Sequence, residues 1–205
     1  MIAATVAVVV VGVVAVLVVA RMRRPRHDPE LDAKLKLAAI ACDSTQIAEL
    51  IRRGAGPNHQ ESNGSTPLAF AVLSPAPSKP AAVATLIAHG ADPNLLVGSP
   101  PHTSPLDYAV RLGDEPTISA LLDGGGNVNG ADPRGYTALH YAALLSADGE
   151  RAREMEGKAA LLLQRGADPN LHAKNGKTPL DLAKEGGDPG IIRLCSGAPG
   201  GAATR

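Results

Sequence analysis

The chain has 205 residues, and its 20 Lys and Arg residues are balanced by 20 Asp and Glu residues. This balance produces no net field toward nucleic acid, and no basic stripe runs along the chain, so nucleic acid is excluded as an expected partner. The aromatic residues are one Phe and three Tyr, with no Trp, although 44% of the residues are hydrophobic. A core must therefore be built from many small aliphatic side chains, which favours stacked helices.

The first part of the chain is strongly apolar. Residues 2–20 contain no charged side chain, and ten valines lie within residues 1–20. A helix of this length spans about 28 Å, which matches the hydrocarbon thickness of a bilayer. A transmembrane anchor helix is therefore predicted over residues 1–20, with membrane contact through residues 2–20.

Basic residues directly follow this apolar run. Four arginines lie within residues 21–26, and the positive-inside rule then predicts the N-terminus outside and the chain from Arg21 onward in the cytoplasm. Residues 21–32 form a basic juxtamembrane linker. The alternative is a cleaved signal peptide ending at residues 18–20, which would place the remainder in the periplasm. No basic residue precedes the apolar run, and the arginines after it resist translocation, so an uncleaved anchor is favoured.

Two short patterns recur through the rest of the chain. The first reads Thr-Pro-Leu-x-x-Ala or close to it, at residues 66–71, 104–109, 137–142 and 178–183. The second reads Gly-Ala-Asp-Pro-Asn or close to it, at residues 54–58, 90–94, 125–129 and 166–170. The starts of the first pattern are 38, 33 and 41 residues apart, and a step of 33 back from Thr66 reaches Ala33. These motifs resemble the ankyrin repeat, whose period is about 33 residues and whose mark is Thr-Pro-Leu-His-x-Ala.

The resemblance implies an all-α ankyrin-repeat solenoid, in which each repeat is a helix-turn-helix with a projecting hairpin tip. The expected repeats cover residues 33–196, and their ranges are 33–65, 66–103, 104–136, 137–177 and a partial repeat over 178–196. Thr66 and Thr178 offer a hydroxyl to cap a first helix, and Pro follows each at the first helical position, whereas the first repeat lacks a Thr-Pro start. Glycines such as Gly90 end the second helices, because glycine adopts a left-handed cap without strain. Asp28-Pro29-Glu30 is a helix-start signal ahead of the first repeat, and residues 197–205 are expected to be a disordered tail.

Two insertions interrupt the repeat phase. Residues 74–80 contain three prolines and are expected to be stiff, whereas residues 147–158 are charged and can extend a helix. Insertions confined to loops are tolerated by a stacked solenoid. The sequence leaves open whether either insertion contacts a partner.

Catalytic and metal-binding patterns are absent from the sequence. The six histidines are dispersed, and His140, at the position of the ankyrin histidine, is expected to form hydrogen bonds near a helix start. Asp92 and Asp168 recur because the turn requires them. Cys42 and Cys195 are expected at opposite ends of the stack, too far apart for a disulfide. The sequence therefore predicts no enzyme, no cofactor, no metal site and no small-molecule substrate.

The resemblance also implies where a partner binds. Such proteins generally bind through the hairpin tips and the exposed face of the first helices, which together form a concave surface. Carried over by position, the tip residues are Ser62, Asn63, Ser65, Pro133, Arg134, Tyr136, Lys174, Asn175 and Lys177. The positions on the first helices are Leu73, Arg111, Leu144 and Glu185. Tyr136 and Arg134 are of the residue types that dominate binding energy at interfaces.

The leading hypothesis is a membrane-anchored scaffold or adaptor that binds a protein partner on the cytoplasmic side. An alternative of another class is an inhibitor of immunity type that masks a partner enzyme or toxin. An adjacent gene for a toxin or a secreted lipase would favour inhibition. The sequence does not identify the partner.

The predicted topology has a direct test. Protease added outside intact cells should leave the repeats uncut, because the arginines after the apolar run hold them in the cytoplasm. Immunoblotting of the repeats and N-terminal sequencing measure this outcome. Loss of the repeats, or a mature chain that begins at Arg21, would contradict the predicted anchor.

Overall fold

A computed structural model describes residues 28–98, 103–146 and 151–197. Within these ranges the chain forms α-helices and two isolated β-bridges, with no β-strand. The helices are α2 (Pro29–Ala41), α3 (Ser44–Arg52), α4 (Pro67–Leu73), α5 (Lys79–Ala88), α6 (Pro105–Leu112), α7 (Glu115–Asp123), α8 (Ala138–Leu145), α9 (Ala152–Gln164), α10 (Pro179–Gly186) and α11 (Pro189–Gly197).

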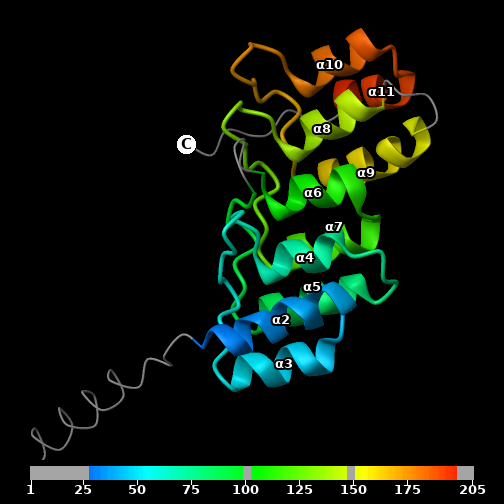
Figure 1. The fold of residues 1–205 in the computed structure, drawn as a ribbon. Coiled ribbons are helices and arrows are strands. Elements are labelled where there is room, and N and C mark those ends of the chain that lie inside the picture. The colour runs from blue at the N-terminus through cyan, green and yellow to red at the C-terminus, as the bar shows by residue number, and fades with distance from the viewer. Residues whose placement is uncertain (1–27, 99–102, 147–150, 198–205) are drawn as a thin grey trace, which may run out of the picture.

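These helices stack as two layers. The inner helices α2, α4, α6, α8 and α10 pack each against the next, and the outer helices α3, α5, α7, α9 and α11 form the second layer (Figure 1). The turns and hairpins that join the repeats lie together along one side of the stack (Figure 1). The expected helical solenoid is confirmed over the described residues.

The inner helices begin as their sequences predict. The Thr66 hydroxyl accepts a hydrogen bond from the Ala69 N–H at 3.2 Å, which caps α4 while Pro67 occupies the first turn. Ser104 and Thr178 form capping boxes at α6 and α10. The outer helix α5 is followed by Gly90 at φ 94°, in the left-handed region that favours glycine.

The helix-start signal predicted at Asp28-Pro29-Glu30 is confirmed, and it lies within the range expected for the linker. Helix α2 starts at Pro29, so residues 29–32 of the expected linker over 21–32 are helical. The Asp28 carboxylate fixes this start by accepting hydrogen bonds from the N–H groups of Glu30 and Leu31 at 3.0 and 3.4 Å. Leu31 is buried, and its burial anchors the extra turn to the stack.

The core is a continuous column of small and branched aliphatic side chains. One alanine of each inner helix occupies the same repeat position and is at most 1% exposed; these are Ala38, Ala71, Ala109, Ala142 and Ala183. Their small size lets neighbouring inner helices approach closely. Three places before each alanine lies a leucine, and Leu35, Leu68, Leu106 and Leu139 are buried. No repeat encloses this core alone, because each buries its apolar face against its neighbours.

An asparagine ladder joins consecutive turns. The Asn94 side chain donates to the Gly125 carbonyl at 3.1 Å and accepts from the Asn127 N–H at 2.7 Å. Asn58 makes the same pair of bonds one repeat earlier, and Asn129 makes it one repeat later. Asn170, at the same position of the last turn, bonds only within its own turn, to Asp168.

Both insertions satisfy carbonyl groups that the preceding inner helix leaves unpaired at its C-terminus. In the first, the Ser74 hydroxyl donates to the Ile40 carbonyl at 2.7 Å, at the end of α2. In the second, the buried Lys158 Nζ donates to the Val110 carbonyl of α6 at 2.8 Å and pairs with Glu154 at 2.6 Å. The last carbonyls of a helix have no partner within the helix, so each insertion stabilises its neighbouring repeat.

Several sequence predictions fall on residues that the structure does not describe. The predicted anchor over residues 1–20, the tail from residue 198 and residues 147–150 of the second insertion lie outside the described residues. None of the helices in the described part is both long and apolar enough to cross a bilayer. Cys42 follows α2 and Cys195 lies in α11, and both are buried free thiols. Burial raises the pKa of Cys195 to about 11.

Replacement of Asn94 by Ala tests the ladder. The variant loses two hydrogen bonds between repeats, and we expect the free energy of unfolding to fall by about 1–2 kcal/mol in urea denaturation. Asn170→Ala is the matched control and should change stability much less, because that side chain bonds only within its own turn. Equal losses in the two variants would contradict a stabilising role for the ladder.

Candidate functional site

The four first-helix positions predicted from the sequence fall at one repeat position, on the inner helices. Leu73 and Leu144 are 43% and 48% exposed, Arg111 is half-buried and Glu185 is exposed. Ile40 of α2 occupies the same position in the first repeat and is 43% exposed. We call these five residues the inner row.

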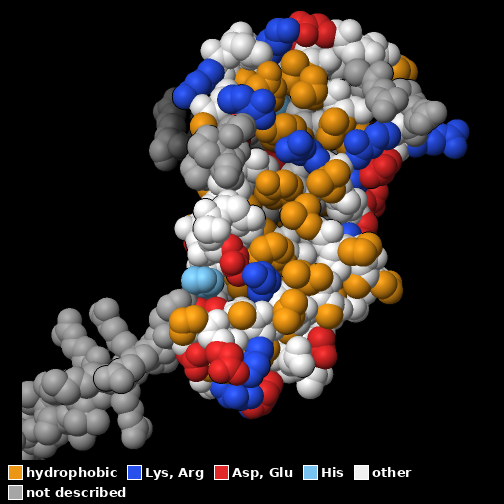
Figure 2. Space-filling view, viewed as in Figure 1, with side chains coloured by type: hydrophobic (Ala, Val, Ile, Leu, Met, Phe, Trp, Pro, Cys, Tyr) orange, Lys and Arg blue, Asp and Glu red, His pale blue; other side chains and the backbone are white. Residues whose placement is uncertain are grey.

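The exposed large apolar side chains of the described residues belong to this layer. Among the described residues, every large hydrophobic side chain that is exposed belongs to α2, α4, α6 or α8; these are Leu37, Ile40, Leu73, Leu112 and Leu144. Figure 2 shows apolar side chains gathered in a band along this face of the stack. A contiguous exposed apolar band on a folded protein is typical of an interaction surface.

Two arginines and two tyrosines form a cluster beside the band. The Arg134 guanidinium carbon lies 5.2 Å from the ring centroid of Tyr136 and 5.9 Å from that of Tyr141. The guanidinium carbon of Arg111 lies 5.4 Å from the Tyr141 ring centroid. The two tyrosine rings are themselves 5.8 Å apart. Cation–π contacts of this kind hold the arginines in place, with Arg134 exposed at the surface and Arg111 half-buried.

Asp132 holds this cluster together from beneath. Its buried carboxylate accepts hydrogen bonds from the Arg134 N–H at 2.8 Å, the Arg134 Nε at 3.1 Å, the Tyr136 N–H at 3.0 Å and the Tyr141 hydroxyl at 2.8 Å. Burial acts to raise the pKa of Asp132, but these hydrogen bonds outweigh it and lower the pKa. Burial and the bond to Asp132 raise the pKa of Tyr141 to about 12, so this hydroxyl stays a donor.

The next hairpin adds polar groups to the cluster. The Lys174 N–H donates to the Arg134 carbonyl at 2.9 Å, and Asn175 Nδ2 donates to the Tyr136 hydroxyl at 3.0 Å. Lys177 Nζ pairs with Glu185 of the inner row at 2.6 Å. Gly135, at φ 81°, forms the tight turn beside Lys174, and a Cβ there would lie 2.9 Å from the Lys174 nitrogen. The two hairpins therefore form one surface.

The remaining predicted tip residues divide between two places. Pro133 is exposed next to Arg134, at the edge of the cluster. Ser62 and Asn63 are exposed and Ser65 is half-buried in the hairpin before α4, two repeats away. That hairpin carries no charged or aromatic side chain at these positions, and the Asn63 side chain accepts from the Ser65 N–H at 3.0 Å. The structure thus brings six of the nine predicted tip residues together and leaves three apart.

Asp107 and His140 occupy the same position in successive repeats. The His140 ring accepts the Thr137 N–H at Nδ1, at 3.1 Å, and Nε2 lies 3.2 Å from the Lys177 carbonyl, so Nε2 carries the hydrogen. This confirms the structural role predicted for His140. Asp107 accepts the Ser104 N–H at 3.2 Å with one oxygen, whereas its other oxygen is buried without a partner. Burial raises the pKa of Asp107 to about 6, against the opposing hydrogen bonds from Ser104.

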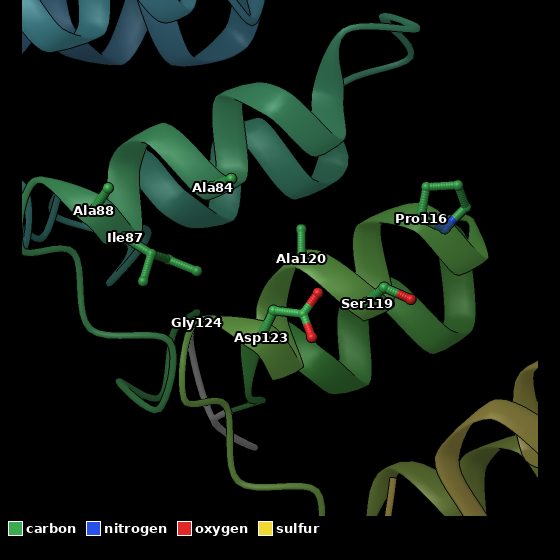
Figure 3. A pocket seen from close by; sticks show the side chains of 8 residues that line it. All are labelled: Ala84, Ile87, Ala88, Pro116, Ser119, Ala120, Asp123 and Gly124. Carbon is green, nitrogen blue, oxygen red and sulfur yellow. The ribbon is translucent and has the colours of Figure 1, made fainter. Parts of the chain in front are cut away.

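A groove of about 600 Å³ lies on the opposite layer, between the outer helices α5 and α7. Figure 3 shows small residues lining it, with Ala84 and Ala88 on α5, Ala120 on α7 and Gly124 directly after α7. Its charged residue, Asp123, already pairs with Arg165 at 2.7 Å. The groove offers no free charge to orient a small molecule, so the inner face is the stronger candidate.

Comparison with known proteins identifies the repeat. A family model described as ankyrin repeats in three copies matches residues 76–155, which span α5 to α8 and reach the start of α9. The chain belongs to the ankyrin-repeat family. Ankyrin repeats are protein-interaction modules, and the structure places their inner helices and hairpins where the exposed apolar, aromatic and cationic side chains gather.

The relatives of this ankyrin-repeat chain are diverse. Ankyrin repeat and SOCS box protein 6 from Homo sapiens is 38% identical over 165 residues, covering 77% of this chain and 37% of that protein. Mitochondrial disaggregase from Bos taurus is 34% identical over 157 residues, covering 76% of this chain and 21% of that protein. Neurogenic locus notch homolog protein 1 from Homo sapiens is 30% identical over 152 residues, covering 74% of this chain and 6% of that protein. The chain spans well under half the length of each, so the similarity concerns the repeats alone.

Three residues that organise the site escaped the sequence analysis as site residues. Tyr141 belongs to a core motif and was assigned to the helix, and Asp132 reads as an ordinary turn residue before Gly135. Only the packing of two repeats shows that they meet. Ile40, by contrast, lies 33 residues before Leu73, and the repeat period by itself would have placed it in the inner row. In the part of the chain that the structure describes, no cluster of three His, Cys, Asp or Glu side chains is arranged to hold a metal ion.

The buried Asp107 predicts an unusual dependence of stability on pH. Its folded pKa of about 6 lies above the reference value of 3.8, so its favourable contribution is complete below pH 3.8 and is lost as the pH rises through 6. We compare the free energy of unfolding of Asp107→Asn with that of the wild type at two pH values by urea unfolding. The difference, variant minus wild type, should be about 2 kcal/mol more favourable to the variant at pH 7 than at pH 4.

Asp181 supplies a control of opposite sign at the same repeat position. Hydrogen bonds from the Thr178 N–H and hydroxyl lower the pKa of Asp181, so its contribution is present at neutral pH and lost as the pH falls. Asp181→Asn should therefore lose stability at pH 7 and approach wild type in acid. An Asp107→Asn variant with the pH profile of the wild type would contradict the assigned pKa.

Proposed function

We propose that this protein is a scaffold or adaptor that binds a protein partner on the inner face of its repeats and holds it at a membrane. The observation that carries the proposal is the confinement of the exposed large apolar side chains, among the described residues, to four inner helices. Covering water-exposed leucine and isoleucine side chains with a partner stabilises the complex by about 25 cal/mol per Å² of apolar surface buried.

The aromatic cluster supports the same face. Tyrosine and arginine are enriched among residues that dominate binding energy, and Arg134 and Tyr136 stand exposed or half-exposed beside the apolar band. Their side chains are held by Asp132 and Asn175, so little conformational freedom is lost on binding. No catalytic reaction is part of this proposal, since binding alone accounts for the side chains that the face presents.

Membrane attachment is the part of the proposal that rests on sequence alone. Residues 2–20 carry no charge and are long enough for one crossing, and the arginines that follow favour a cytoplasmic location for the repeats.

Substitution of two inner-row leucines by lysine tests the binding face. We expect Leu73→Lys combined with Leu144→Lys to reduce crosslinked partner at least about tenfold in a pull-down from the native cells, because two charges replace apolar contacts. Both side chains are exposed, so the fold should tolerate the changes. Quantitative mass spectrometry of the crosslinked material measures the loss.

The matched control places two lysines on the outer layer. Ala84→Lys combined with Ala88→Lys alters exposed positions of α5 that line the outer groove, with the same change in charge. This variant should retain the partner. Retention by both variants would contradict binding at the inner face, and loss only in the outer-layer variant would assign the site to the groove between α5 and α7.

A further inference from the structure

The inner row has a distinct order of chemistry along the stack. From α2 to α8 it presents Ile40, Leu73, Arg111 and Leu144, an arginine set among three apolar side chains. Three other cations near this face have acidic partners, since Lys36 pairs with Glu61, Arg134 with Asp132 and Lys177 with Glu185.

Arg111 differs from these cations in lacking an acidic partner. Its guanidinium lies over the Tyr141 ring and forms no ion pair with a described carboxylate. A guanidinium that is fixed on an aromatic ring and forms no close ion pair with a described carboxylate is suited to a carboxylate from a partner.

The spacing of the row selects the form of that partner. Packed helices lie about 8–10 Å apart, so the four residues from Ile40 to Leu144 span about 30 Å. Seven residues of an α-helix rise about 10.5 Å and return to nearly the same face, so one helix can contact all four of these residues. The side chains of a β-strand alternate between two faces and rise about 3.3 Å per residue. Neighbouring side chains on one strand face are therefore closer together than neighbouring helices of the stack, so a β-strand does not match the spacing of the row.

The width of the inner face also matches an α-helix of the partner. Helices α4 and α8 contain 7 and 8 residues, which gives them lengths of about 10–12 Å. An α-helix with its side chains is about 10–12 Å wide, so a single helix laid across the inner helices covers this face.

We propose that the occupant of the inner face is an amphipathic α-helix of a partner protein, with four positions spaced by seven residues. Three of these positions are apolar and contact Ile40, Leu73 and Leu144, and one inner position is Asp or Glu and contacts Arg111. This inference rests on the proposed function, because it names the partner of the same face.

Selection from a helical peptide library tests the inference. The probe is a phage-displayed alanine-rich helix of about 24 residues in which four positions spaced by seven are randomised. The full chain is immobilised, and an Arg111→Glu variant is selected in parallel. Arg153→Glu makes the same charge change on the exposed surface of α9 and serves as the control.

We expect wild type and Arg153→Glu to enrich apolar residues at three positions and Asp or Glu at one inner position. Arg111→Glu should instead enrich Lys or Arg there, and the wild-type helix should bind it about tenfold more weakly. The absence of enrichment, an acidic residue at an end position, or identical selections on wild type and Arg111→Glu would overturn the inference. A chain that dimerises until Leu73 is changed to Lys would show instead that a second copy covers the face.

The two proposals fail in different ways. If Leu73→Lys with Leu144→Lys abolishes partner crosslinking while no helix is enriched, the inner face remains the binding site and the helical partner is wrong. If the same double variant keeps its partner, the proposed function fails, whatever the library yields.

Discussion

Each turn between the internal repeats is tied to the next by one asparagine side chain that both donates to a carbonyl and accepts from an N–H. Asn58, Asn94 and Asn129 repeat these two bonds along the stack. Because both bonds involve backbone groups of the following turn, they fix the offset between repeats independently of the side chains elsewhere. The regular offset aligns the inner helices, brings the buried alanines of neighbouring helices into contact and places the inner row in register. A solenoid depends on such contacts between neighbours, since no contact spans distant repeats.

The insertions keep this register although they change the length of a repeat. Ser74 and Lys158 lie in different insertions, yet each donates to a carbonyl at the C-terminal end of the inner helix in the preceding repeat. The ends of short helices leave a large share of their carbonyls unpaired, so a donor supplied from the next repeat stabilises both. Ser74 and Lys158 therefore act within the stack at these contacts.

The inner row of the candidate site can be predicted from the sequence, whereas the cluster around Tyr141 cannot. The inner row follows from the repeat period, because residues at one repeat position share one face. The cluster around Tyr141 does not follow from it, because Asp132, Arg111 and Tyr141 come from different segments, and their contact depends on how the hairpin folds over the helices. The same packing decides the state of Asp107. A carboxylate in a capping position normally stays ionised, but burial against the next repeat raises the pKa of this one to about 6.

The sequence by itself determined the repeat, the capping residues, the glycine helix ends and the structural role of His140, because these depend on local backbone preferences and on a period that insertions do not erase. It also indicated four of the five residues of the inner row, Leu73, Arg111, Leu144 and Glu185. Only the tertiary structure decided that Lys158 is buried against α6, and that six of the predicted tip residues meet while Ser62, Asn63 and Ser65 lie apart. These outcomes depend on contacts between repeats, whose geometry is set by the packing of side chains across the stack and not by the order of residues within one repeat.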